Sequence, residues 1–182
     1  ARVTKLHASA QEVFDKSQAA QKRREPGPLR VMGISCTMMS QASPRISTSE
    51  WGLEKALQTA KEKYSAETKL FKLRDMSIRT CEGFYSKSKF ACTFPCSITE
   101  MDEKDEMAAI YLNMIAWADI ILIATPIRWG NASSLLYKMV ERLNSVQNQI
   151  ATQRKYLIKN KVAGFIITGG QDNVQKVAGE LM

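Results

Sequence analysis

The sequence predicts a doubly wound α/β domain, that is, a parallel sheet with helices on both of its faces. Short and nearly continuous apolar runs recur along the chain, as is typical of strands that are covered on both sides. Segments whose apolar residues follow helical spacing stand between these runs. A strand–helix order that repeats about four times favours parallel strands joined by helical crossovers.

The bulk composition is that of a single globular domain. The chain has 182 residues, of which 45% are apolar and 24% are charged. No apolar run approaches the roughly 20 residues of a membrane span. Net charge is +8, but the only dense basic cluster is at 21–25, so we expect solvated surface charge and no nucleic-acid partner. Without a secretory signal, we expect a cytoplasmic protein whose four cysteines are free thiols.

An N-terminal arm is expected to precede the domain over residues 1–28. Helical spacing predicts a helix over 9–24, with Ser9 as its cap. The sequence "EPGP" at 25–28 then breaks the chain. The only histidine, His7, lies in this arm, so neither a histidine metal site nor a Ser-His-Asp triad is expected in the domain.

The first half of the domain contains two predicted strands. The run "LRVMGIS" at 29–35 predicts a buried strand, and a polar loop leads from it into a helix over 50–64. A second strand is predicted over 68–75. Residues 76–102 have no clear periodicity and form an irregular excursion, which we expect to act as a lid or as a subunit contact.

The second half repeats the same order. Acidic residues in the first turn predict a helix over 103–118, and "ADIILIAT" at 118–125 predicts a strand. Helical spacing resumes from Ser133, followed by a strand over 161–168 and a helix over 171–182. A doubly wound domain usually has a fifth strand and a final helix, so we expect either that this chain lacks a C-terminal piece or that the sheet edge is completed otherwise.

Ligands bind such sheets at the carboxyl ends of the strands, where three loops qualify: a first loop at 35–49, a second at 125–132 and a third at 168–173. The first loop, 35–49, is rich in hydroxyl groups and leads with Arg45 straight into a helix. Free backbone N–H groups at a helix N-terminus, with Ser and Thr hydroxyls and an arginine, are typical of a phosphate site. Simple helix capping is the alternative, but capping needs one hydroxyl and three stand in a row at 47–49. The triphosphate-binding pattern G-x-x-x-x-G-K-[ST] and the dinucleotide pattern G-x-G-x-x-G are both absent.

The second loop, 125–132, combines Pro126, Arg128, Trp129 and Gly130. A flavin needs apolar surface against its ring and close backbone donors, and a glycine allows that approach. Arg128 would compensate negative charge on a reduced flavin or attract nicotinamide-nucleotide phosphates; a plain surface charge is the alternative. For Trp129 the alternative is a core or subunit-interface aromatic.

Three motifs in register carry a family resemblance over about residues 29–182. The segments "GIS…SPRISTSE…ALQTA", "ADIILIATPIRWGNASSLLYKMVERL" and "VAGFIITGGQD" resemble the NADPH-dependent FMN reductase branch of the flavodoxin-like superfamily. The resemblance implies that FMN is held by all three loops. Its phosphate would be held by Ser35, Arg45, Ser47, Thr48 and Ser49. The ring and ribityl chain would be lined by Pro126, Ile127, Arg128, Trp129, Gly130 and Asn131, and on the other side by Thr168, Gly169, Gly170, Gln171 and Asp172.

The resemblance also implies an activity. NADPH or NADH would pass a hydride to FMN, which would reduce a quinone, a flavin or another small acceptor. No catalytic side chain is expected, because the cofactor performs the chemistry. A flavodoxin-type electron carrier without NAD(P)H turnover is the alternative, although such carriers are typically acidic; a regulatory protein without turnover is another. Family members usually form homo-oligomers, so a homodimer or homotetramer is expected.

Some relatives in this superfamily carry an iron–sulfur cluster on four closely spaced cysteines. Here Cys81, Cys92 and Cys96 stand in the corresponding excursion, separated by ten and three residues. Three thiolates do not complete a four-cysteine site, and Cys36 belongs to the first loop. We therefore expect no iron–sulfur cluster and no other metal.

Overall fold

The computed structural model describes residues 7–20, 26–40, 42, 44–170 and 173–182. The chain divides into two compact units. The sheet unit comprises Gly27–Met76, Ala118–Tyr137 and Lys161–Met182. The helical unit comprises Ala1–Pro26, Ser77–Trp117 and Lys138–Asn160. In the described ranges, no helix combines the length and the apolar character needed to cross a bilayer.

Four parallel strands build the sheet unit, as the sequence predicts. They are β1 (Arg30–Ser35), β2 (Glu67–Lys72), β3 (Ile120–Arg128) and β5 (Val162–Thr168). Their spatial order is β2-β1-β3-β5, with every neighbouring pair parallel. Order along the chain and order in the sheet therefore differ, so the loops after β1 and β3 diverge at a switch point.

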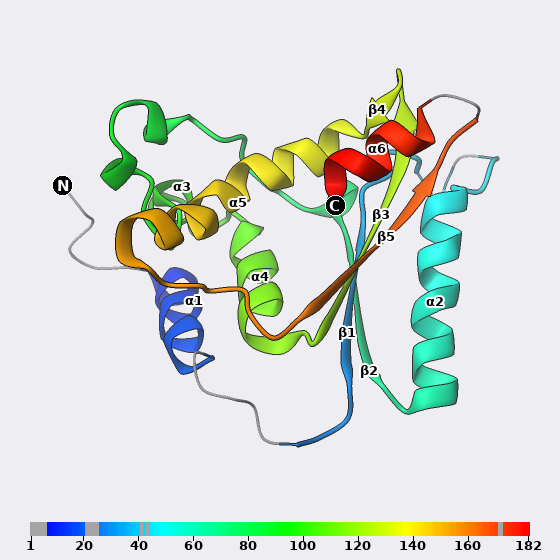
Figure 1. The fold of residues 1–182 in the computed structure, drawn as a ribbon, viewed down its shortest axis with the longest axis horizontal. Helices are drawn as coiled ribbons and strands as arrows, with labels where there is room; N and C mark the ends of the chain where they lie inside the picture. The colour runs from blue at the N-terminus through cyan, green and yellow to red at the C-terminus, as the bar shows by residue number, and fades with distance from the viewer. Residues whose placement is uncertain (1–6, 21–25, 41, 43, 171–172) are drawn as a thin grey trace. The chain divides into compact units, whose positions relative to one another are not determined.

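Two helices flank this sheet. Figure 1 shows α2 (Thr48–Tyr64) along one side of the strands and α6 (Val174–Leu181) on the other. On α2, Leu53 and Leu57 are buried against Val31 and Ala124 of the strands and Ala66 before β2. Burying these side chains holds the N-terminus of α2 at the carboxyl edge of the sheet.

The structure moves two predicted strand ends. Strand β2 ends at Lys72 and a 3₁₀ turn takes up 73–75, so the predicted strand 68–75 is too long. Strand β3 continues to Arg128, because Thr125 and Pro126 still pair with Ile167 and Thr168. The predicted second loop is therefore mostly strand, closed by a two-residue turn before β4 (Asn131–Ala132).

The helical unit holds the arm, the excursion and most of the long helix α5. Its helices are α1 (Ala8–Ala19), α3 (Ser97–Met101) and α4 (Met107–Leu112), which continues into a π-helical segment at Asn113–Trp117. Two 3₁₀ turns, Phe84–Ser86 and Lys89–Ala91, lie in the excursion. Helix α5 spans Ser134–Gln153, and the division between units falls within it.

Two helix starts differ from the predictions. Helix α1 is capped by His7, whose side chain accepts a hydrogen bond from the backbone N–H of Ala10, so Ser9 lies inside the helix rather than at its cap. The predicted helix end at 21–24 lies outside the described residues. Helix α4 begins at Met107 instead of residue 103 because the preceding acidic segment forms a turn that directs Asp105 into the interior.

Asp105 meets Arg142 of α5 in the core of the helical unit. Both side chains are fully buried, and Arg142 Nη2 lies 2.6 Å from Asp105 Oδ2. Arg142 also donates to Thr99 Oγ1 at 2.7 Å and to the carbonyl oxygen of Arg79 at 2.8 Å. A buried pair is stabilising only when additional hydrogen bonds satisfy its polar groups. Here they satisfy both terminal nitrogens of Arg142, whereas its Nε has no hydrogen-bond partner among the described residues.

A second side chain of α5 contacts the excursion through its backbone. Asn148 Nδ2 donates to the carbonyl oxygens of Lys89 at 2.5 Å and Cys92 at 2.8 Å. Together with the contact from Arg142 to Arg79, α5 therefore holds the excursion at three carbonyl groups.

Candidate functional site

The carboxyl ends of β1, β3 and β5 lie at one edge of the sheet. The register places Ser35 of β1 opposite Ala124 of β3, and Pro126 of β3 opposite Thr168 of β5. The loops that follow these strands therefore meet at this edge, as the parallel arrangement predicts.

A cleft of about 770 Å³ opens there. It is lined by Met39, Arg45, Ile46, Ser47, Thr48, Pro126, Arg128, Ile167, Thr168, Gly169 and Val174. All of these residues belong to the sheet unit and come from all three predicted loops and their flanking elements. The volume lies within the range of about 300–1,000 Å³ that is usual for small-molecule and cofactor sites.

The structure brings some predicted site residues into this cleft and leaves others out. Those that line it are Arg45, Ser47, Thr48, Pro126, Arg128, Thr168 and Gly169. Those that do not are Ser35, Ser49, Ile127, Trp129, Gly130, Asn131 and Gly170. Gln171 and Asp172 lie outside the described residues.

Polar groups of the cleft concentrate at the N-terminus of α2. Ser47 is the N-cap residue, yet its side chain makes no capping hydrogen bond to the first turn; its Oγ lies 3.2 Å from that of Ser49. The first backbone N–H groups of a helix have no partner within the helix, and they carry its positive dipole end. The cleft therefore has an anion-binding end, which Arg45 lines as well.

The hairpin after β3 is shaped by an unusual turn. Trp129 and Gly130 have φ values of +52° and +71°, the left-handed conformation of a tight two-residue hairpin turn. Trp129 is 99% exposed, so it stands at the hairpin tip rather than in a core. Asn173 Nδ2 donates to the Gly130 carbonyl oxygen at 3.5 Å, and Lys176 Nζ to Asn131 Oδ1 at 3.2 Å. These bonds tie the hairpin to the start of α6.

Of the two adjacent glycines after β5, only Gly169 is packed so closely that there is no room for a side chain. A Cβ atom on Gly169 would lie 2.9 Å from Ile127 Cβ, closer than real Cβ contacts come. Ile127 thus packs under the third loop instead of facing the cleft. A Cβ on Gly170 would meet nothing within 4 Å.

Ser35 takes part in a charge network beside the cleft. Its hydroxyl donates to Glu50 Oε2 at 2.6 Å. Glu50 also accepts from Lys72 Nζ at 2.9 Å and from both terminal nitrogens of Arg74, with Nη2 at 3.0 Å from Oε1. Lys72 additionally reaches Glu54 at 2.9 Å.

The network decides the charge state of Glu50. Burial alone would raise the pKa of its carboxyl, but hydrogen bonds from Arg74, Ser35 and Lys72 outweigh burial and lower that pKa to about 2. The pKa of Arg74 is raised, first by its hydrogen bond to Glu50. Glu50 is therefore a carboxylate at neutral pH, and its charge is compensated from β2 and the turn after it.

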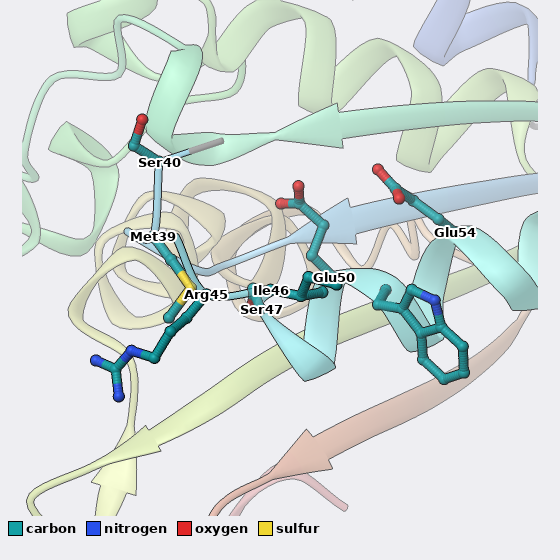
Figure 2. A pocket seen from close by; sticks show the side chains of 8 residues that line it. Met39, Ser40, Arg45, Ile46, Ser47, Glu50 and Glu54 are labelled. Atoms are coloured by element: carbon teal, nitrogen blue, oxygen red, sulfur yellow. The ribbon is translucent and has the colours of Figure 1, made fainter. Parts of the chain in front are cut away.

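A second, smaller cavity of about 200 Å³ shares the segment around residues 45–47 with the cleft (Figure 2). It is lined by Met39, Ser40, Arg45, Ile46, Ser47, Glu50, Trp51 and Glu54. In Figure 2 the side chains of Arg45 and Glu50 point away from one another. Glu50 thus lines the smaller cavity while Arg45 lines both.

Four apolar residues of the cleft were missed by the sequence reasoning: Met39, Ile46, Ile167 and Val174. Ile46 is 76% exposed, which is unusual for an isoleucine. Apolar residues within a hydroxyl-rich loop, the Met38–Met39 pair and the isolated Ile46, were the signal that could have identified Met39 and Ile46. Ile167 was indistinguishable from an ordinary buried strand residue.

This set of donors fits FMN. The anion-binding end matches a phosphate, and the apolar residues together with Pro126 offer surface to an isoalloxazine ring. Arg128 lines the cleft and donates from Nη1 to the carbonyl oxygen of Ile127 at 3.0 Å.

The cysteines of the excursion differ in exposure. Cys81 is exposed, Cys92 is half-buried and accepts from Asn144 Nδ2 at 3.4 Å, and Cys96 is buried. Among the residues that the structure describes, no three His, Cys, Asp or Glu side chains are grouped so as to hold a metal ion.

Curated relatives of this chain are flavoproteins or flavin-related enzymes. An iron-sulfur flavoprotein of Methanocaldococcus jannaschii is 29% identical over 147 residues, which cover 80% of this chain and 64% of that protein. An iron-sulfur flavoprotein of Archaeoglobus fulgidus is 25% identical over 112 residues, 62% of this chain and 48% of that protein. The 8-demethyl-8-aminoriboflavin-5′-phosphate synthase of Streptomyces davaonensis is 34% identical over 71 residues, 39% of this chain and 28% of the synthase. This chain thus spans less than two thirds of each of these relatives.

A solved structure shows the same fold. RosB, crystallised with the bound intermediate 8-demethyl-8-formylriboflavin-5′-phosphate, aligns with a TM-score of 0.61 over 84% of this chain and 57% of RosB, at 22% identity. The mostly parallel sheet is therefore flavodoxin-like. The family model for NADPH-dependent FMN reductases matches residues 38–182, which include the whole cleft. The chain belongs to the NADPH-dependent FMN reductase family.

Proposed function

We propose that this protein binds FMN non-covalently in the cleft and transfers a hydride from NADPH or NADH, through the flavin, to a quinone, a flavin or another small acceptor. The observation that carries the proposal is the cleft itself, which joins an anion-binding helix end to apolar surface at the carboxyl edge of the sheet. Family membership supports the cofactor. One relative is named for the synthesis of a riboflavin 5′-phosphate derivative, which also supports a phosphorylated flavin.

In this proposal the start of α2 binds the phosphate. The free N–H groups of the first turn and the hydroxyls of Ser47 and Thr48 would donate to the phosphate oxygens, and Arg45 would add a charged donor. A dianion is stabilised at this end of a helix by the dipole and by the unpaired N–H groups.

The rest of the cleft would position the ring. Pro126 and Thr168, opposite each other in the sheet, form its floor, and Gly169 keeps that floor free of a side chain. Met39 and Ile46 supply apolar surface that excludes water. Arg128 on the lining would attract the phosphates of the nicotinamide nucleotide.

Bound FMN supplies the hydride chemistry, and the protein supplies position and electrostatics. The first hydride transfer requires neither a general acid nor a general base from the protein. We therefore assign no catalytic side chain to this chain.

The visible spectrum of the purified full-length protein, before and after incubation with FMN, tests the proposal. FMN absorbance and uptake are expected, followed by oxidation of NADPH or NADH with a quinone as acceptor. A protein that neither carries nor takes up FMN would refute the proposal. Bound FMN without turnover of either nucleotide would favour the electron carrier instead.

Matched variants of α2 localise the binding. Ser47→Ala combined with Thr48→Val should raise the FMN Kd about 10- to 100-fold, the usual effect of losing hydrogen bonds to a charged group. Lys55→Ala changes an exposed residue of the same helix, outside the cleft, and should leave the Kd unchanged. Equal effects of the two changes would place the flavin elsewhere.

We also propose a cytoplasmic homodimer or homotetramer with FMN as its cofactor and no iron–sulfur cluster. The cysteines of the excursion supply three thiols, whereas the common clusters need four ligands. The same visible spectrum reports a cluster as broad additional absorbance, and light scattering of the full-length protein reports the oligomer.

A further inference from the structure

Glu50 presents an electrostatic problem for a phosphate site. It is the third residue of α2, so its carboxylate belongs to the helical turn whose N–H groups would bind the phosphate. A negative charge there is favourable to the empty helix but repels a second anion. The side chain of Glu50 is only 9% exposed, so solvent screens its charge poorly.

Residues of β1, β2 and the turn after β2 compensate the charge of Glu50 from the side away from the cleft. Arg74 binds both carboxylate oxygens of Glu50, and its own side chain is 7% exposed. Lys72 adds a second cation, and Ser35 donates to Oε2. None of these three residues lines the cleft. Arg45 lines the cleft itself, and its side chain points away from Glu50 (Figure 2).

We propose that Arg74 is a positioning residue that gives the cleft its selectivity for a phosphorylated flavin. Its two-armed ion pair neutralises Glu50 and fixes this carboxylate on the side of α2 that faces β1 and β2. The N-terminus of α2 then presents its N–H groups and hydroxyls to a phosphate without an opposing charge. Ser35 acts in the same way, through Glu50 rather than on the phosphate. This inference rests on the proposed function, because it takes the start of α2 as the phosphate site.

The test compares FMN with riboflavin, which has the same ring and no phosphate. Both are titrated by flavin fluorescence into flavin-depleted full-length protein and into the variants Arg74→Met, Glu50→Gln and the double variant. Arg74→Met should raise the FMN Kd on the order of tenfold and less so at high salt, because it removes the two-armed partner of Glu50 and leaves this carboxylate near the phosphate with only Lys72, which is shared with Glu54, as a compensating cation. The riboflavin Kd should change by less than about threefold, since a neutral ligand does not sense that charge.

The other variants separate charge from structure. Glu50→Gln should leave FMN binding unchanged or tighter, and the double variant should return the FMN Kd to within about threefold of the wild-type value, because no charge is then uncompensated. If the two single changes weaken both flavins alike and the double variant is no better, the network is merely structural and the inference is wrong.

Two further outcomes are distinguishable. If the wild-type protein binds FMN and Arg74→Met has the same ratio of riboflavin to FMN affinity as the wild type, this inference is overturned and the proposed function stands. Wild-type protein that does not bind FMN overturns the proposed function itself. If Arg74→Met shows no cooperative unfolding, Arg74→Lys and Glu50→Gln carry the test: both should keep or increase the preference for FMN, and a preference lost in either overturns the inference.

Discussion

Replacing Arg142 with methionine should lower the free energy of unfolding by about 3–5 kcal/mol, the usual cost of removing one partner from a buried ion pair. Arg142 and Asp105 are both fully buried, with 2.6 Å between Nη2 and Oδ2. Methionine restores part of the packed volume, so the loss comes mainly from the stranded carboxylate. Thr99 and the carbonyl oxygen of Arg79 also lose a donor.

The chain offers a matched control. Lys16 and Glu12 on α1 also form a pair at 2.6 Å, but their side chains are 56% and 48% exposed. Lys16→Met should therefore cost less than about 1 kcal/mol. Urea unfolding followed by circular dichroism at pH 7 measures both variants. If Arg142→Met costs no more than Lys16→Met, burial does not set the strength of the pair and the reasoning is refuted.

The pH dependence of the same variant has a defined sign. In the wild type, burial raises the pKa of Asp105, but hydrogen bonds from Arg142 and Thr99 lower this pKa by more than burial raises it, so the net shift is downward. The stability from this pair is therefore present above the ordinary aspartate pKa of about 3.9 and is lost as the pH falls through the folded-state value. In Arg142→Met the pKa of Asp105 should rise, so the stability gap to wild type should widen from acid to neutral pH. A gap that is constant with pH would contradict this account.

Three more predictions concern Gly169, Glu50 and the reactivity of two cysteines. Gly169→Ala should lower the free energy of unfolding by about 1–3 kcal/mol, because the new Cβ would lie 2.9 Å from an isoleucine side chain of β3. Gly170→Ala should cost much less, because its Cβ would meet nothing within 4 Å. Thermal unfolding of the two variants tests this difference. Glu50 has a folded-state pKa of about 2 against an ordinary 4.5, so its stabilisation is present above about pH 4.5 and is lost as the pH falls toward 2. Glu50→Gln should remove this part of the acid sensitivity, which unfolding midpoints between pH 2 and 5 would reveal. Burial raises the pKa of the Cys36 thiol to about 12, so iodoacetamide at pH 8 should alkylate exposed Cys81 and spare Cys36 in the folded protein, as peptide mass spectrometry can determine.

The sequence predicted the fold well because buried parallel strands have a strong local signature. The apolar runs at 29–35, 118–125 and 161–168 correspond to β1, β3 and β5. Their order with the intervening helices was sufficient to predict the sheet and the edge at which the three loops meet. The loops were found because hydroxyl, proline and glycine residues stand out after such runs.

Partners distant in the sequence were not predictable. The sequence predicts Ser35 as a phosphate-binding hydroxyl and places Glu50 at the start of a helix without a role, and only the fold brings both to Arg74. The sequence places Asp105 among the acidic residues in the first turn of a predicted helix, but the structure buries it against Arg142, 37 residues away. The same periodicity describes an exposed and a buried charged residue, so sequence pattern alone could not separate these cases.

The contacts of α5 with the excursion have a consequence for how this segment can vary. Arg142 and Asn148 bind the carbonyl oxygens of Arg79, Lys89 and Cys92, which are groups that every amino acid carries. The path of the segment therefore depends little on which side chains it displays. Substitutions along 82–90 should be tolerated far better than a change at Arg142 or Asn148, so this stretch is suited to diverge among relatives or to accept an engineered label.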